Sequence, residues 1–169
     1  MLSKKVEGIL NEQILKEDYS SQLYLAMASW AENQGFEGVS EWLYAQSEEE
    51  RMHMLKLVRY INERDGNAVI PGMEKPPAEF GNIFEMFDQV LAHEQYISGS
   101  INDIVAVCIA ENDYTTQSWI QWFVNEQIEE EASVKAIIDK LKLVGKNNLY
   151  MFDRDIMSLR ASAGDTAEA

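Results

Sequence analysis

The sequence predicts an all-α protein, an antiparallel four-helix bundle with one long crossover between its second and third helices and a short fifth helix near the C-terminus. Four long segments place apolar residues three and four positions apart, the period of a helix that buries one face. No stretch of useful length alternates apolar and polar residues as a half-buried strand would. All three prolines lie in one short region, so helix breakers are rare elsewhere.

The four predicted long helices are separated by breaks of two kinds. Glycines interrupt the pattern between the first and second helices, and an Asn-Asp pair interrupts it between the third and fourth. Both breaks are short, so each pair of helices must form an antiparallel hairpin. The predicted helices span residues 4–34, 39–65, 82–111 and 116–144.

Residues 66–81 connect the two hairpins. Pro71, Pro76 and Pro77 prevent this stretch from being helical throughout. A helix of about 27 residues is roughly 40 Å long, and about 16 extended residues reach roughly 53 Å. The connection can therefore return along the whole bundle, which makes the second and third helices parallel.

The C-terminal part of the chain follows Gly145. Apolar residues recur with helical spacing along residues 147–159, which predicts a short fifth helix. A chain of 169 residues suits one domain large enough to bury a core, and we expect that domain to span residues 1–160. Residues 161–169 are small or polar, and we expect them to form a disordered tail.

The acidic balance of the chain limits its partners. With 29 acidic and 14 basic residues, the net charge is -15, which repels nucleic acid and anionic membranes and attracts cations. The longest uncharged apolar run, residues 104–110, is too short to cross a bilayer. Cys108 is the only cysteine, so an internal disulfide is excluded, and the N-terminal segment lacks the pattern of a secretion signal. We expect a cytoplasmic protein.

Polar residues interrupt the apolar stripe of each long helix near its middle. Each lies about 12 to 16 residues into its own helix, so their side chains should meet at one level of the bundle. The inward-facing polar residues are Glu17 in the first helix, Glu50 and His53 in the second, Glu94 in the third, and Gln127 and Glu130 in the fourth.

Carboxylates that meet in a protein interior repel one another and take up protons unless positive charge compensates them. Two divalent cations would balance the four carboxylates. The Glu50-x-x-His53 spacing puts an oxygen and an imidazole ligand on one helical face. Ligation dominated by oxygen favours iron or manganese over structural zinc. The sequence therefore predicts a buried site for two metal ions.

Two other interpretations start from the same residues. The acidic runs at residues 48–50 and 129–131 are typical of solvated helix faces. Taken alone, His53 would be an interior histidine with its hydrogen bonds satisfied, and Tyr24 or Trp122 would be a packing residue. A structural helical bundle without a metal site leaves the shared level of the interruptions unexplained. A di-iron oxidase or peroxidase that stores no iron would use the same paired site without a shell.

These residues resemble those of the ferritins, specifically the haem-free bacterial and archaeal type, over nearly the entire chain. The resemblance implies a first iron at Glu17, Glu50 and His53, with Gln127 nearby. It implies a second iron at Glu50, Glu94 and Glu130, so that Glu50 bridges the two. It also implies a third iron position at Glu49, Glu126, Glu129 and Glu130, and a tyrosine, Tyr24, beside the centre.

The resemblance also implies the function. An iron-storage protein of this type has ferroxidase activity: Fe(II) is oxidised with dioxygen or peroxide at a di-iron centre within each subunit. The ferric mineral is kept inside a homo-oligomeric shell of 24 subunits. Bacterioferritins carry a methionine directly after the bridging glutamate, whereas Arg51 stands there and Met52 follows, so we expect no haem.

Overall fold

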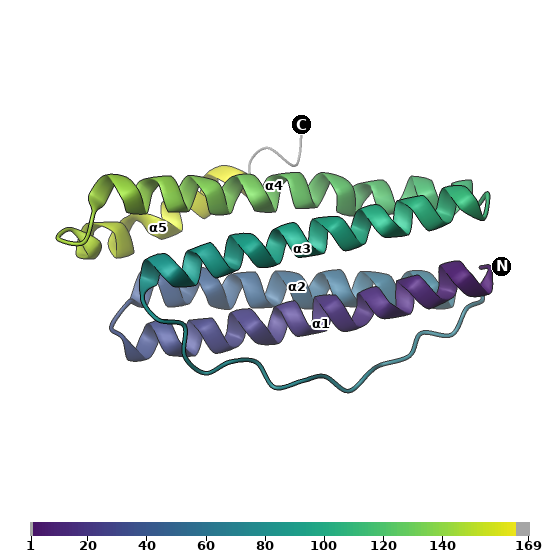
Figure 1. Ribbon diagram of the computed structural model, residues 1–169, viewed down its shortest axis with the longest axis horizontal. Helices are drawn as coiled ribbons and strands as arrows, with labels where there is room; N and C mark the ends of the chain where they lie inside the picture. The colour runs from purple at the N-terminus through teal and green to yellow at the C-terminus, as the bar shows by residue number, and fades with distance from the viewer. Residues whose placement is uncertain (1, 165–169) are drawn as a thin grey trace.

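The computed structural model describes residues 2–164, which form five helices and contain no strand. Helices α1 and α2 form one antiparallel hairpin and α3 and α4 form the other, with α1 packed against α3 (Figure 1). The predicted fold class is confirmed. None of these helices is long and apolar enough to cross a membrane. Their bounds are α1 Lys4–Asn33, α2 Glu37–Glu63, α3 Ile83–Ala110, α4 Tyr114–Val144 and α5 Leu149–Gly164.

Side-chain caps fix where three of the helices begin. Ser3 Oγ accepts a hydrogen bond from the backbone N–H of Val6 at 3.3 Å, which caps α1. Asn82 caps α3, and Asp113 caps α4 by accepting from the Thr116 N–H at 3.0 Å. Each cap satisfies a backbone donor that the helix itself leaves unpaired. The helices therefore start within two residues of their predicted positions.

The crossover between α2 and α3 runs the length of the bundle, as predicted (Figure 1). It is tied to α1 through Asn11, whose side-chain amide donates to the Asn67 carbonyl at 3.1 Å and accepts from the Val69 N–H at 2.7 Å. Near its end, Phe80 is 1% exposed and packs edge-on against Trp30. Because the connection returns along the whole bundle, α2 and α3 run parallel.

The buried apolar residues form two separate clusters, one toward each end of the bundle. One contains Trp42 and Phe87, and the other contains Leu10 and Phe123. In all four long helices the chain passes from one cluster to the other through a short buried polar stretch, for example at Glu17 in α1. The bundle is thus two apolar cores with a polar layer between them.

Helix α5 begins two residues after its predicted start and continues to Gly164, into the stretch that was expected to be a tail. It packs against α2 and α4, where Phe152 is 3% exposed. The Val39 N–H donates to Asp153 Oδ1 at 2.9 Å, so the side chain of α5 satisfies a donor in the first turn of α2. The remainder of the expected tail, residues 165–169, lies outside the described residues.

The contact between α5 and α2 gives a test of this docking. A Cβ added at Gly38 would lie 1.8 Å from the Asp153 carbonyl oxygen, so Gly38→Ala must push the two backbones apart. We expect a loss of about 1–3 kcal/mol in the free energy of unfolding. Urea unfolding followed by circular dichroism measures it.

Gly8→Ala is the matched control, because Gly8 lies within α1 with nothing within 4 Å of an added Cβ. That substitution should stabilise the protein by about 0.5–1 kcal/mol through helix propensity. A Gly38→Ala protein as stable as the wild type would show that α5 does not pack as described.

Candidate metal centre

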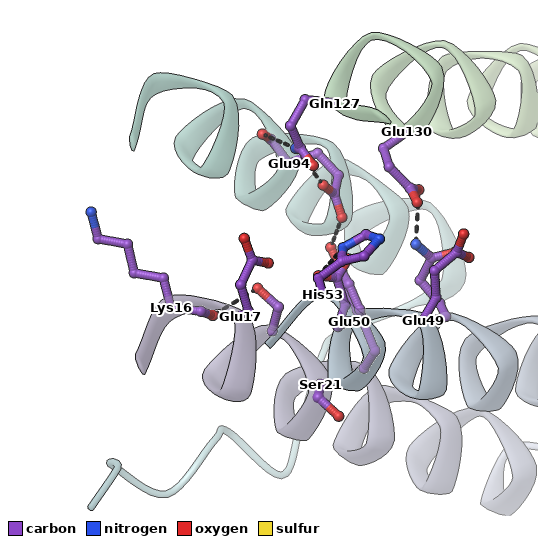
Figure 2. Close-up of polar contacts among 12 residues, drawn as sticks. Lys16, Glu17, Ser21, Glu49, Glu50, His53, Glu94, Gln127 and Glu130 are labelled. Carbon is purple, nitrogen blue, oxygen red and sulfur yellow. Dashed lines mark hydrogen bonds and ion pairs between the residues drawn. The ribbon is translucent and has the colours of Figure 1, made fainter. Parts of the chain in front are cut away.

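The polar layer brings together the six residues that the sequence placed on the inward-facing stripes (Figure 2). They come from all four long helices and are between 1% and 6% exposed. Their common level follows from the antiparallel hairpins, because the midpoints of helices of similar length coincide. They are Glu17 of α1, Glu50 and His53 of α2, Glu94 of α3, and Gln127 and Glu130 of α4.

Glu17, Glu50 and His53 form the tightest group in this layer. Each offers one ligand atom, and these atoms lie within 4.8 Å of one another. His53 Nδ1 is 3.3 Å from Glu50 Oε2. The Gln13 side-chain amide donates to Glu17 Oε1 at 2.8 Å and is itself oriented by Ser100, whose hydroxyl donates to Gln13 Oε1 at 2.8 Å.

The other carboxylate oxygen, Glu17 Oε2, is buried and has no hydrogen-bond partner. Native proteins rarely leave a buried acceptor unpaired, because its lost hydration costs free energy. A cation between Glu17, Glu50 and His53 would supply the missing partner. This oxygen is the observation in the structure that points most directly to a metal ion.

Glu94 and Glu130 are held from the other side of the layer. The Tyr24 hydroxyl donates to Glu94 Oε1, and the Gln127 amide donates to Glu94 Oε2 at 3.0 Å. The Gln46 amide donates to Glu130 Oε2 at 2.8 Å. Gln127 therefore acts here as a donor that orients Glu94, with its own carbonyl oxygen left for another partner.

Burial raises the pKa of all four carboxyl groups in the layer. It is the largest cause for Glu17, Glu50 and Glu130, whose pKa values are raised well above the ordinary range, with neighbouring carboxylates adding to it. The pKa of Glu94 is also raised by burial, against the opposing hydrogen bonds from Tyr24 and Gln127. Without cations the layer therefore holds protons, and a cation that binds there must displace them.

A second group lies at the edge of the layer. Ligand atoms of Glu49, His53 and Glu126 lie within 4.8 Å of one another, and both carboxylates are half-buried. Burial raises the pKa of Glu126, and the negative charge of Glu129 adds to that effect. Glu129 itself is exposed, and neither it nor Glu130 belongs to this group. Among the residues described, His53 is thus shared by both candidate groups.

Some residues that support the layer were not identified from the sequence. Gln13 and Gln46 each precede a buried glutamate by four residues, a spacing that places them on the same helical face and could have revealed them. Trp122, expected to be a packing residue, is 39% exposed, with its ring edge-on to His53 and the Lys56 ammonium 3.7 Å from its centroid.

Known proteins place this arrangement in a family. The ferritin-like domain family matches residues 7–144. A bacterial non-heme ferritin from Campylobacter jejuni is 40% identical over 164 residues, 96% of this chain and 98% of that protein. The chain belongs to the ferritin family. A probable bacterial non-heme ferritin-like protein from Haemophilus influenzae is 39% identical over 165 residues, 96% of this chain and the whole of that protein.

Solved structures agree with the sequence relatives. The open-pore ferritin of Archaeoglobus fulgidus superposes with a TM-score of 0.90 at 37% identity, covering 92% of this chain and 98% of that one. As a ferritin, the protein stores iron and oxidises Fe(II) to Fe(III), and the function predicted from the sequence is confirmed. Which of its residues bind the iron remains a prediction.

The raised pKa values make the stability of the metal-free protein depend on pH. A carboxyl group whose folded pKa lies above its unfolded value binds more protons in the folded state, so its contribution to stability falls as pH rises above the ordinary value of 4.5. Glu17→Gln removes one such charge. We expect the metal-free variant to unfold at a higher temperature than the wild type at pH 7.5, and this difference to vanish near pH 4.5.

Thermal unfolding of both metal-free proteins across this pH range makes the comparison. Glu12→Gln is the control, because Glu12 lies exposed on the same helix, outside the buried layer. Adding Zn(II) should stabilise the wild type more than Glu17→Gln. A constant offset between Glu17→Gln and the wild type at all pH values would contradict the raised pKa of Glu17.

Proposed function

We propose that the buried polar layer is the ferroxidase centre, and that two Fe(II) ions bind in it as substrates. The first position uses Glu17, Glu50 and His53, with Gln127 nearby. The second uses the carboxylates of Glu50, Glu94 and Glu130, so that Glu50 bridges the two positions. The unpartnered oxygen of Glu17, within reach of the other two ligands of the first position, carries this proposal.

The chemistry of the layer fits this substrate. Two dications balance four carboxylates, which removes the repulsion that otherwise draws protons into the site. Six inward residues offer mainly oxygen atoms and one imidazole, a set that suits iron. Each Fe(II) gives up one electron to the oxidant, dioxygen or peroxide. The carboxyl groups give up their protons as iron binds, and the apolar clusters on both sides limit the access of water.

Tyr24 and Gln127 act by orienting Glu94. Tyr24 donates to one carboxylate oxygen of Glu94 and Gln127 donates to the other, so this carboxylate is positioned before iron binds. The fourth helix offers Gln127-x-x-Glu130 where many di-iron proteins have a second Glu-x-x-His. The second position therefore lacks a histidine, which suits iron that passes through the site as substrate.

A third iron position is proposed at the edge of the layer, where Glu49 and Glu126 lie with His53. Glu129 and Glu130 follow on the same helix and are included from the family resemblance. These carboxylates are more exposed than those of the paired site, apart from Glu130. Iron that leaves the buried layer through them moves toward water, where a mineral can grow.

Storage also requires a container, and we propose that the chain assembles into a homo-oligomeric shell of 24 subunits. Several large apolar side chains are more than half exposed in the single chain, among them Ile70, Ile128 and Leu143. Exposed apolar surface of this kind is typical of subunit contacts. A cytoplasmic location and the absence of haem and of nucleic-acid or membrane partners stay predictions from the sequence.

The alternatives differ in what they require of the structure. A structural bundle would gain nothing from four buried carboxylates and an unpartnered oxygen, which cost stability. An oxidase that stores no iron needs the paired site alone, without the half-buried group at Glu49 and Glu126 or the shell. The storage function uses all of these features.

Iron loading separates these functions directly. A large excess of Fe(II) is added in air to the metal-free protein, and size exclusion then follows protein and iron together. We expect ferric iron to co-elute with a very large assembly, far beyond two ions per chain. About two per chain on a small species would favour the oxidase, and none would contradict a metal site.

Glu50→Ala tests the bridging role. Because Glu50 contributes to both iron positions, its removal should lower the initial rate of Fe(II) oxidation by more than about tenfold while the assembly stays intact. Stopped-flow absorbance measures the rate, and size exclusion checks the assembly. Glu48→Ala is the matched control, since Glu48 is exposed on the same helix. Equal rates in the two variants would show that oxidation occurs elsewhere.

A further inference from the structure

Arg160 is the residue through which the fifth helix reaches the metal centre. Its guanidinium donates from Nη1 to Gln46 Oε1 at 2.9 Å, and from Nη2 to Glu49 Oε2 in a charge-assisted hydrogen bond. Both partners lie on α2, more than 100 positions earlier in the chain. The contacts exist because α5 packs along α2 and α4.

Each partner of Arg160 leads to an iron position. Gln46 accepts from Arg160 with its oxygen and donates to Glu130 with its nitrogen, so the arginine fixes which way this amide points. Glu49 belongs to the half-buried group with His53 and Glu126. The Arg160 guanidinium is therefore paired with a carboxylate that is proposed to bind the third iron.

We propose that Arg160 is a positioning residue that serves as a built-in counter-cation for the third iron position. Its guanidinium holds Glu49 while no third cation is bound and is released from this carboxylate when one binds. The inference rests on the proposed function, because it requires a cation position at Glu49 and Glu126, beside the histidine that serves the first iron.

Electrostatics sets the two cations in competition. A guanidinium and a dication on one carboxylate repel each other at a distance of a few ångströms, so a bound metal ion favours release of the arginine. The side chains of Arg160 and Glu49 are 27% and 32% exposed. Water screens an ion pair at this depth, so the pair is weak enough to exchange.

The paired site has no such competitor. In the described part of the chain, no lysine or arginine forms a hydrogen bond or ion pair with its carboxylates, which are Glu17, Glu50, Glu94 and Glu130. A cation there displaces only protons. Arg160 thus lowers the affinity of the third position relative to the paired site, and iron that reaches Glu49 is released more readily toward the mineral.

Zinc binding tests this inference without any oxidation step. Isothermal titration calorimetry with Zn(II), a dication that does not change its oxidation state, is run on the assembled metal-free full-length protein. The wild type should bind two ions per chain tightly and a third more weakly. Arg160→Gln should raise the affinity of the third step by about fivefold, the factor that a partly exposed ion pair supplies. The affinities of the first two steps should change less, because Arg160 reaches the paired site through the uncharged amide of Gln46.

Two further variants separate competition from a general loosening of α5. Arg160→Lys keeps the positive charge on a side chain of different length and shape. Its affinity for the third Zn(II) should lie between those of the wild type and Arg160→Gln. Arg154→Gln removes a charge from the same helix and should match the wild type, because among the described residues Arg154 forms its ion pair with the exposed Asp155.

Three results would overturn the inference while leaving the paired site in place. The first is an Arg160→Gln protein whose third Zn(II) binds no more tightly than in the wild type, and the second is the absence of a third binding step from both the wild type and Arg160→Gln. The third is an equal change in the affinities of all three steps. Failure of the proposed function looks different, because the wild type would then bind no Zn(II) in its buried layer at all.

Discussion

Four carboxylates buried at one level of a helical bundle form the interaction on which the rest of this structure depends. Burial and mutual repulsion both disfavour their charged forms, so the layer must hold protons or cations. The surrounding residues orient the carboxylates without neutralising them: the amides of Gln13 and Gln127 and the hydroxyl of Tyr24 donate hydrogen bonds and carry no charge. The site is thus arranged for a positive ion that the protein itself does not supply.

The stability for this arrangement comes from elsewhere in the bundle. Two apolar clusters enclose the polar layer. Each is built mainly from residues of the long helices on one side of the layer, and one of them also contains Phe80 of the crossover and Phe152 of α5. The long crossover keeps α2 and α3 parallel, and both hairpins are antiparallel (Figure 1). The chemical layer and the cores that stabilise the fold are therefore separate parts of the same four helices.

Burial decreases from the paired site toward the surface. Glu17 and Glu50 are each 1% exposed, whereas Glu49 is half-buried and already has a basic partner in Arg160. The free-energy cost of a charged carboxylate without a cation falls along this direction, because water screens the outer groups. On the proposed path, iron would move from the site where the buried carboxylates most need a cation to one where Arg160 already supplies positive charge.

The sequence by itself determined the helices, the long crossover and the inward orientation of the six buried polar residues. These features depend on the spacing of apolar residues, the length of the connecting segments and the positions of the prolines, all of which are read directly from the sequence. Helical spacing also places Gln13 and Gln46 on the same helical faces as Glu17 and Glu50. Helix α5 packs on α2 and α4 and continues to Gly164, beyond residue 159, where its predicted apolar stripe ends.

Only the tertiary structure decided how residues from different helices meet. It showed the unpartnered oxygen of Glu17, the two groups that share His53, and the contact of Arg160 with Glu49 across 111 positions of sequence. Helical periodicity fixes the face on which a side chain lies, but not the neighbour that another helix brings to it. That neighbour depends on how whole helices pack, and for Arg160 on where α5 docks.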